Sequence, residues 1–169
     1  MIRSALVIFL CGFARTVVAE PCVVERHAYA PLADLEAIDL ELIGRATHSI
    51  DMAAYVLTSI PIVRALDAAA ERGVAVRLYR DGRDARMPRR LAEAYDRLAA
   101  RPNVEIRYKG DRQPFMHLKA YAVDGELVRE GAGNFTHVGL RVQDNSLVAL
   151  KCGSAVTRFE EAFERMWVR

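Results

Sequence analysis

Residues 117–124 read HLKAYAVD and residues 131–136 read GAGNFT, and these two stretches decide the fold and the chemistry. In an extended chain every second side chain points to the same face, so His117 and Lys119 project together, roughly 7 Å apart along the strand. Asn134 adds a side chain that can both donate and accept a hydrogen bond. The two stretches therefore predict a site where an imidazole, an ammonium and a carboxamide handle one phosphate group.

A hairpin explains how the two stretches meet. Asp124 followed by Gly125 is typical of a tight turn between antiparallel strands. The return strand delivers residues 131–134 close to His117. The glycines at 131 and 133 allow a ligand or another backbone to approach closely. We interpret Asp124 mainly as a structural turn residue, because aspartates in turns commonly bond backbone groups.

The compound pattern resembles the phospholipase D superfamily, whose signature is His-x-Lys-x4-Asp followed by Gly-Ser-x-Asn-x-Thr. The first part matches in full, and Gly131, Asn134 and Thr136 follow in register. Residues 50–57, 72–77 and 163–167 are similar to the small, single-motif, nuclease-like branch. The resemblance implies a phospholipase D-like α/β sandwich, with phosphodiester cleavage that needs neither a metal nor a cofactor.

The resemblance also implies the catalytic roles. His117 is the expected nucleophile, forming a phosphohistidine, while Lys119 and Asn134 hold the non-bridging oxygens and Thr136 supports them. A second motif histidine would protonate the leaving group, and this chain has one such motif. We therefore expect a homodimer in which the second imidazole is His117 of another copy.

Two positions depart from the family pattern. Ala132 stands where the family usually has Ser. The Glu that often orients the catalytic imidazole is replaced at the corresponding position by Asn145, and Asp144 could substitute through a shift of one residue. These departures leave a slow or degenerate enzyme open as an alternative.

The remaining pattern predicts strands alternating with helices. A mixed sheet flanked by helices, with parallel units first and the antiparallel hairpin after them, follows from this order. Pro31, Ser59 and Pro88 mark helix starts, Gly73 marks a helix end, and Ser154 is predicted to cap the last helix. The expected helices are 31–46, 59–73, 88–100 and 154–167, and the expected strands are 49–57, 74–79, 104–108, the motif hairpin and 145–151.

The first 19 residues have a basic start, a short apolar run and small residues before Glu20, as secretory signal peptides do. We expect cleavage after Ala19, export to the periplasm or medium, and one domain at residues 20–169. An uncleaved anchor is the alternative. In an oxidising compartment Cys22 and Cys152 could form a disulfide, although sequence cannot supply the required approach.

Charge within the chain is uneven. Residues 72–112 contain 12 Lys or Arg and six Asp or Glu, and a local excess of this kind favours phosphate contacts. The alternative is a helix face that is simply solvated, which we favour for Arg89, Arg90 and Arg97. The residues predicted to bind substrate are Arg80, Arg83, Lys109 and Arg112, with Arg77 and Arg86 as further candidates.

Three functions remain open on the sequence. The leading one is a metal-independent nuclease acting on DNA or RNA. The second is a phospholipase D acting on phospholipid headgroups, although a long amphipathic membrane-binding helix is not evident in the sequence. The third is a non-catalytic dimer that binds polyanions, suggested by Ala132 and Asn145.

Overall fold

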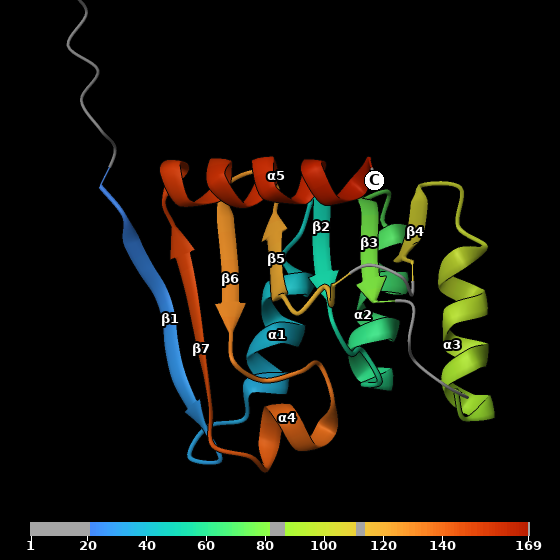
Figure 1. The fold of residues 1–169 in the computed structure, drawn as a ribbon, viewed down its shortest axis with the longest axis horizontal. Coiled ribbons are helices and arrows are strands. Elements are labelled where there is room, and N and C mark those ends of the chain that lie inside the picture. Colours follow the sequence, from blue (N-terminus) through green and yellow to red (C-terminus); the bar gives the residue numbers. More distant parts are fainter. Residues whose placement is uncertain (1–20, 82–86, 111–113, 169) are drawn as a thin grey trace, which may run out of the picture.

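A seven-stranded mixed sheet with helices on both faces forms the core of the computed structural model, which describes residues 21–81, 87–110 and 114–168 (Figure 1). The strand order is β1-β7-β6-β5-β2-β3-β4. The single mixed α/β domain predicted from the sequence is confirmed. The strands are β1 (Val23–Ala30), β2 (Ser49–Ala54), β3 (Ala75–Asp81), β4 (Val104–Lys109), β5 (Lys119–Val123), β6 (Leu127–Gly131) and β7 (Asn145–Lys151). The helices are α1 (Leu35–Gly44), α2 (Ile60–Glu71), α3 (Arg89–Ala99), α4 (His137–Arg141) and α5 (Gly153–Trp167).

Strand directions change at the motif hairpin. Strands β2, β3 and β4 pair in parallel, whereas β5 runs antiparallel to β2 and the pairs β5–β6, β6–β7 and β7–β1 are antiparallel. This is the predicted order of parallel units followed by a hairpin. Asp124 and Gly125 both have positive φ, of 55° and 66°, which is the geometry of the tight turn expected there.

Two elements were not predicted, β1 and α4. Strand β1 is an edge strand that reads VVERHAYA and is mostly exposed, so no clean apolar alternation marks it. Helix α4 has only five residues, too few for a recognisable helical period. Both elements depend on contacts with distant parts of the chain.

Helix ends agree with the sequence at Ser59, Gly73 and Pro88 and differ at Pro31 and Ser154. Pro31 was predicted to start the first helix, but α1 begins at Leu35 after the capping residue Asp34, whereas Pro88 directly precedes α3. The Ser59 side chain accepts a hydrogen bond from Ile62 N, as a helix-capping serine does, and Gly73 takes the left-handed conformation with φ 97°. The prediction that Ser154 caps the last helix is wrong. Cys152 precedes α5 as its cap residue, and Ser154 lies within the first turn.

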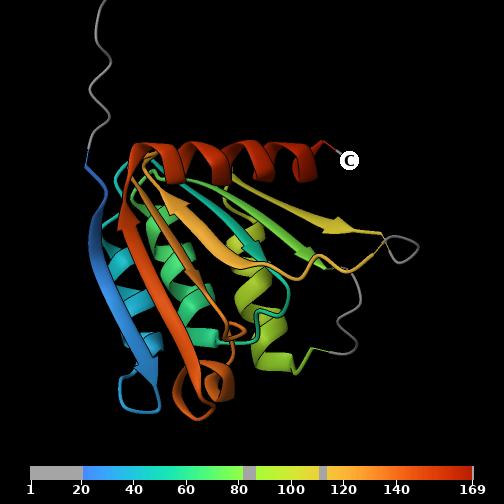
Figure 2. The same cartoon turned by 60° about the vertical axis from the view of Figure 1, so that its left-hand side comes forward.

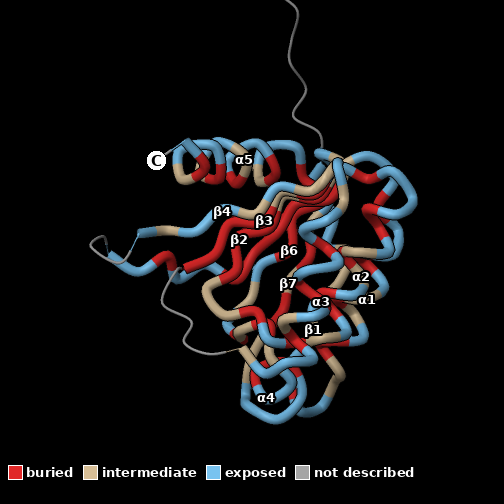
Figure 3. The backbone as a smooth tube through the Cα atoms, turned by 90° about the vertical axis from the view of Figure 1, so that its right-hand side faces the viewer, coloured by how far each residue is buried: buried red, intermediate tan, exposed pale blue. Residues whose placement is uncertain are grey.

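The helices form layers on the two faces of the sheet, with α1 to α3 on one face and α5 on the other (Figure 2). The apolar stripe of α5 is part of the core, because Val156, Phe159, Phe163 and Trp167 are all buried. Burial is greatest in the middle strands, between the two helical layers (Figure 3).

An ion pair lies inside the first of these layers. Asp39 of α1 and Arg129 of β6 are both fully buried and bond through two contacts, Nε to Oδ1 at 2.7 Å and Nη2 to Oδ2 at 2.8 Å. The Tyr121 hydroxyl donates to the same carboxylate at 2.9 Å. The remaining guanidinium nitrogen donates to the carbonyl oxygen of Lys119 at 3.0 Å. The pair therefore joins α1, β5 and β6 at the motif.

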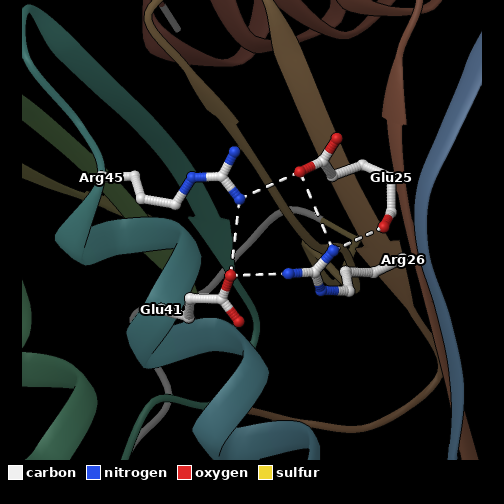
Figure 4. A network of polar contacts seen from close by, with 4 residues as sticks. All are labelled: Glu25, Arg26, Glu41 and Arg45. Carbon is white, nitrogen blue, oxygen red and sulfur yellow. Dashed lines mark hydrogen bonds and ion pairs between the residues drawn. The ribbon is translucent and has the colours of Figure 1, made fainter.

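Strand β1 is held to the domain by charge and by a covalent bond. Glu25 and Arg26 of β1 interleave with Glu41 and Arg45 of α1 in a chain of ion pairs (Figure 4). The hydrogen bond from Arg45 holds the pKa of Glu25 below its usual value. A disulfide joins Cys22 to Cys152, so the pairing that the sequence left open is present in the structure.

We expect Arg129→Met to lower the free energy of unfolding by about 3–5 kcal/mol, because it leaves the buried Asp39 carboxylate unpaired. The double variant Asp39→Leu with Arg129→Met should recover most of that loss, since it removes both charges. Urea unfolding measures both. Arg89→Met is the control, because Arg89 pairs with Glu93 on the surface, and its stability should hardly change. A single variant as stable as the parent would contradict the role of the pair.

Candidate active site

The site is built where the central strand β5 begins and its neighbour β6 ends, at the end of the sheet that faces α4 (Figure 1). His117 lies two residues before Lys119, the first residue of β5, so it precedes the regular strand in which the sequence placed it. Two bonds hold its segment. Tyr55 N donates to Leu118 O at 2.8 Å, and Met116 N donates to the buried carboxylate of Asp81 at 3.0 Å. These anchors fix the backbone on both sides of His117.

His117 and Lys119 are in direct contact, closer than the roughly 7 Å that strand spacing alone predicts. The Lys119 ammonium nitrogen lies 3.0 Å from Nδ1 and 3.2 Å from Nε2 of the imidazole, and it donates to the His117 carbonyl at 2.8 Å. The imidazole is exposed, while the lysine is 7% exposed. The positive charge thus lies beside the candidate nucleophile, where it could neutralise phosphoryl oxygens.

Burial has an electrostatic consequence for Lys119. Desolvation lowers the pKa of Lys119 below the usual value for lysine. The Tyr55 ring lies beside both candidate catalytic side chains. Its centroid is 5.1 Å from the Lys119 ammonium and 4.5 Å from the centroid of the His117 ring. Sequence reasoning assigned no role to Tyr55, and its only signal was an aromatic residue at the end of an apolar strand.

Asn134 lies in the tight loop between β6 and α4. Close packing requires glycine at two positions in or next to this loop. A Cβ atom on Gly133 would lie 2.5 Å from the carbonyl oxygen of Gly139, and a Cβ atom on Gly131 would lie 2.5 Å from the carbonyl oxygen of Ser146. The buried Oδ1 of Asn134 has no hydrogen-bond partner among the described residues. Its side chain therefore keeps hydrogen-bonding capacity that a substrate could use.

The supporting residues mostly shape the backbone. Thr136 caps α4, its hydroxyl accepting from Gly139 N at 2.9 Å. Asn145, expected from its position to orient the imidazole, donates to the Gly139 carbonyl at 2.8 Å and so fastens α4 to β7. Asp144 is exposed and lines a neighbouring hollow together with Ala132. Among the described contacts, none joins Asp144 or Asn145 to His117.

Asp124 is structural, as the sequence predicts, but it bonds the backbone at the start of β2 instead of the backbone of its own turn. Its carboxylate accepts hydrogen bonds from the backbone N–H groups of Thr47, His48 and Ser49 and from the Thr47 hydroxyl, at 2.7–2.9 Å for the shortest bond to each. Burial alone would raise the pKa of Asp124, but these donors outweigh it and lower the pKa. The motif aspartate thus ties the hairpin turn to the start of β2.

Of the residues predicted to bind substrate, the structure describes Arg80 and Lys109, which lie near the ends of the paired strands β3 and β4. Arg80 is fully buried, with its guanidinium 4.8 Å from the centroid of the Tyr95 ring, so its prediction as a surface contact does not fit the structure. Lys109 is half-buried at the end of the edge strand β4. Arg83 and Arg112 lie outside the described residues, as does Arg86.

Other arginines of the same stretch are engaged inside the protein. Arg77 pairs with Asp51 and Glu164, and the bond to Asp51 above all raises the pKa of Arg77 although burial opposes it. The guanidinium of Arg77 lies over the Phe163 ring. Arg101 pairs with Asp67. Arg77, Arg80 and Arg101 are therefore engaged within the protein, whereas Arg89, Arg90 and Arg97 are exposed on α3.

An open hollow of about 390 Å³ exposes the reactive groups. His117 and Lys119 line it together with Glu130, Gly131 and Ala132. Within the described ranges, no group of three or more His, Cys, Asp or Glu side chains could hold a metal ion. No helix in the described part of the chain is long and apolar enough to cross a membrane.

This site contains a histidine that contacts a lysine two residues later, at the start of a hairpin in a mixed sheet. That arrangement is typical of single-motif phospholipase D-like domains. Residues 40–167 match the family model described as cardiolipin synthase, PLD-like domain. The chain therefore belongs to this family, within the phospholipase D superfamily of phosphodiesterases.

Known proteins similar to the chain include two solved structures. Nuc from Salmonella typhimurium, a phospholipase D family member, is 28% identical with a TM-score of 0.77, over 87% of this chain and 95% of Nuc. NucT from Helicobacter pylori is 18% identical with a TM-score of 0.74, over 87% of this chain and 96% of NucT, and shows the shared fold.

A curated relative is the mitochondrial cardiolipin hydrolase of Chlamydomonas reinhardtii. It is 21% identical over 128 residues, which are 76% of this chain and 55% of that protein. The chain thus spans about half the length of this relative.

We expect catalytic activity to fall as pH rises through the lowered pKa of Lys119, because only the protonated ammonium neutralises phosphoryl oxygens. Lys119→Met should lower kcat/KM about 10²–10³-fold. Lys119→Arg should move the alkaline limb of the pH profile upward, since arginine stays charged. The exposed Lys151 is the control, and Lys151→Arg should leave the limb in place. An alkaline limb unmoved by Lys119→Arg would contradict this role.

Proposed function

We propose that the chain is a metal-independent nuclease that cleaves DNA or RNA phosphodiesters through a phosphohistidine on His117. The observation that carries the proposal is the 3.0 Å contact between the Lys119 ammonium and the His117 ring, on the wall of an open hollow. Attack on phosphorus needs an exposed nitrogen nucleophile and a cation to neutralise charge. Both are present.

The resemblance of the sequence to the nuclease-like branch, together with the similarity to Nuc, supports nucleic acid over lipid as the substrate. The chain covers nearly all of Nuc at 28% identity, but about half of the cardiolipin hydrolase at 21%. Nuc is therefore a better guide to the substrate class than the cardiolipin hydrolase, because the similarity covers 95% of Nuc.

The reaction follows from the site. A ring nitrogen of His117 attacks phosphorus, forming the P–N bond as the P–O bond to the leaving alkoxide breaks. Lys119 and the Asn134 carboxamide hold the non-bridging oxygens. The proton for the leaving oxygen comes from a second imidazole. Water then attacks the phosphohistidine, forming a new P–O bond as the P–N electron pair returns to the His117 imidazole. The proton of that water passes to the second imidazole, which is neutral once it has protonated the leaving oxygen.

The second imidazole leads us to propose a homodimer in which two copies of His117 face one phosphate across a two-fold axis. The remaining described histidines are His27, His48 and His137. His27 contacts Tyr29 on the edge strand and His48 contacts the Thr47 hydroxyl near the opposite end of the sheet. His137 begins α4 and has no lysine partner two residues later.

Purified mature protein should cleave single- and double-stranded DNA in EDTA, and acid quenching should trap labelled phosphate on His117. His117→Ala should lower cleavage by at least about 10³-fold, as loss of a nucleophile does. His27→Ala, an exposed histidine on β1, is the control and should retain full activity. Mixed dimers of parent and His117→Ala chains should be inactive, because they hold one imidazole.

Several outcomes would contradict these proposals. Cleavage that requires a divalent ion would exclude the metal-independent route. Full activity in a strictly monomeric preparation would exclude the shared site. Turnover of cardiolipin or phosphatidylcholine vesicles without cleavage of DNA or RNA would favour the phospholipase alternative, which the cardiolipin hydrolase relative suggests. Binding of DNA without turnover, unchanged by His117→Ala, would favour a degenerate binding protein.

We also propose that the protein is exported after cleavage behind Ala19. The Cys22–Cys152 disulfide supports this, because such bonds persist in oxidising compartments. Mass measurement of exported protein without reductant should give a chain that begins at Glu20 and carries no free thiol. A mature mass that includes residues 1–19, or two free thiols, would contradict export with cleavage.

A further inference from the structure

An exposed aromatic ring lies beside the catalytic pair. Phe115 is 58% exposed, two residues before His117. Its ring meets Tyr55 edge to face, with centroids 5.8 Å apart and an interplanar angle of 78°. Edge-to-face packing is a favourable aromatic geometry, so the Phe115 ring has a defined orientation although much of it faces solvent.

Tyr55 connects this ring to the chemistry. Its centroid lies 4.5 Å from that of His117 and 5.1 Å from the Lys119 ammonium, while its backbone N–H bonds Leu118. A single tyrosine ring therefore separates Phe115 from the nucleophile. We call Phe115 and Tyr55 the aromatic shelf.

The position of the shelf matters more than its exposure. Single exposed apolar residues are common on protein surfaces and need no explanation. Phe115, however, borders a site for one phosphate, and in a nucleic acid each phosphate is flanked by flat bases one nucleotide away. Proteins that bind single strands without sequence preference stack bases on such rings beside a cation for the backbone. Here Lys119 supplies the cation.

We propose that the aromatic shelf is a subsite for the nucleobase next to the scissile phosphate, with the base stacked on Phe115 and Tyr55 holding that ring beside His117. This inference rests on the proposed nuclease function and names its preferred substrate form. A stacked base in a duplex is already paired and covered, so the shelf favours single-stranded substrate. Because every base has a flat face, the subsite selects strand form rather than sequence.

Two labelled single-stranded oligonucleotides of equal length test the subsite, one with ordinary bases and one abasic across its central stretch. The mature parent protein should cleave the first with a kcat/KM about tenfold higher, within the range of base stacking on aromatic rings. Phe115→Ala should remove this preference, lowering cleavage of the first and leaving the abasic strand unchanged. Phe115→Trp should keep the preference, since it restores a flat ring.

Val24→Ala is the matched control, because Val24 is 59% exposed on β1 and should affect neither substrate. Thermal unfolding should be alike in all variants, since Phe115 lies largely at the surface. Equal losses on both strands in Phe115→Ala would overturn the inference by assigning the ring a structural role. Equal cleavage of both strands by the parent would also overturn it.

Three further outcomes separate this inference from the function on which it rests. If the parent cleaves neither these oligonucleotides nor duplex DNA, the proposed nuclease function fails and the subsite fails with it. If it cleaves duplex DNA alone, the nuclease function stands and the subsite fails. If the parent cleaves both but Phe115→Ala lowers only the hydrolysis of cardiolipin vesicles, nuclease activity stands and the shelf contacts lipid instead of a base.

Discussion

The buried pair between Asp39 and Arg129 is the interaction on which the site depends. Two charges inside an apolar layer are costly unless each is fully bonded, and here both bonds of the pair and the Tyr121 hydroxyl satisfy the carboxylate. The remaining guanidinium nitrogen bonds the Lys119 carbonyl. The requirement to satisfy buried charge therefore also fixes the backbone that presents the ammonium to His117.

Other hydrogen bonds also fix the backbone around the site. Each joins a polar group to a defined partner and so sets a position that apolar packing alone would not specify. Asp81 bonds the N–H of Met116, and Tyr55 bonds the carbonyl of Leu118, so the residues flanking His117 are held from β3 and from the end of β2. Asp124 accepts three backbone N–H groups at the opposite end of β5. Rigid support of this kind is what a preorganised phosphoryl site needs.

Part of the positive charge in residues 72–112 is used inside the protein. The arginines of residues 72–112 that the structure describes include Arg77 and Arg101 in ion pairs and Arg80 in the interior. Composition counted these side chains as available, but the fold uses them to join β3 to α5 and α2 to the chain after α3. The Lys119 ammonium, desolvated beside His117, is therefore the cation on which the proposed chemistry relies.

The sequence by itself determined the alternating sheet and helices, the Asp124–Gly125 turn and the projection of His117 and Lys119 to one side, because each follows from periodicity or turn chemistry within a few residues. It did not predict β1 or α4, because β1 is an edge strand with charged residues and α4 has only five residues. Only the tertiary structure decided the partners of Asp39, Arg80 and Asn145 and the place of Tyr55 beside the site. Those contacts join residues far apart in the chain, and their energies depend on burial that local sequence does not encode.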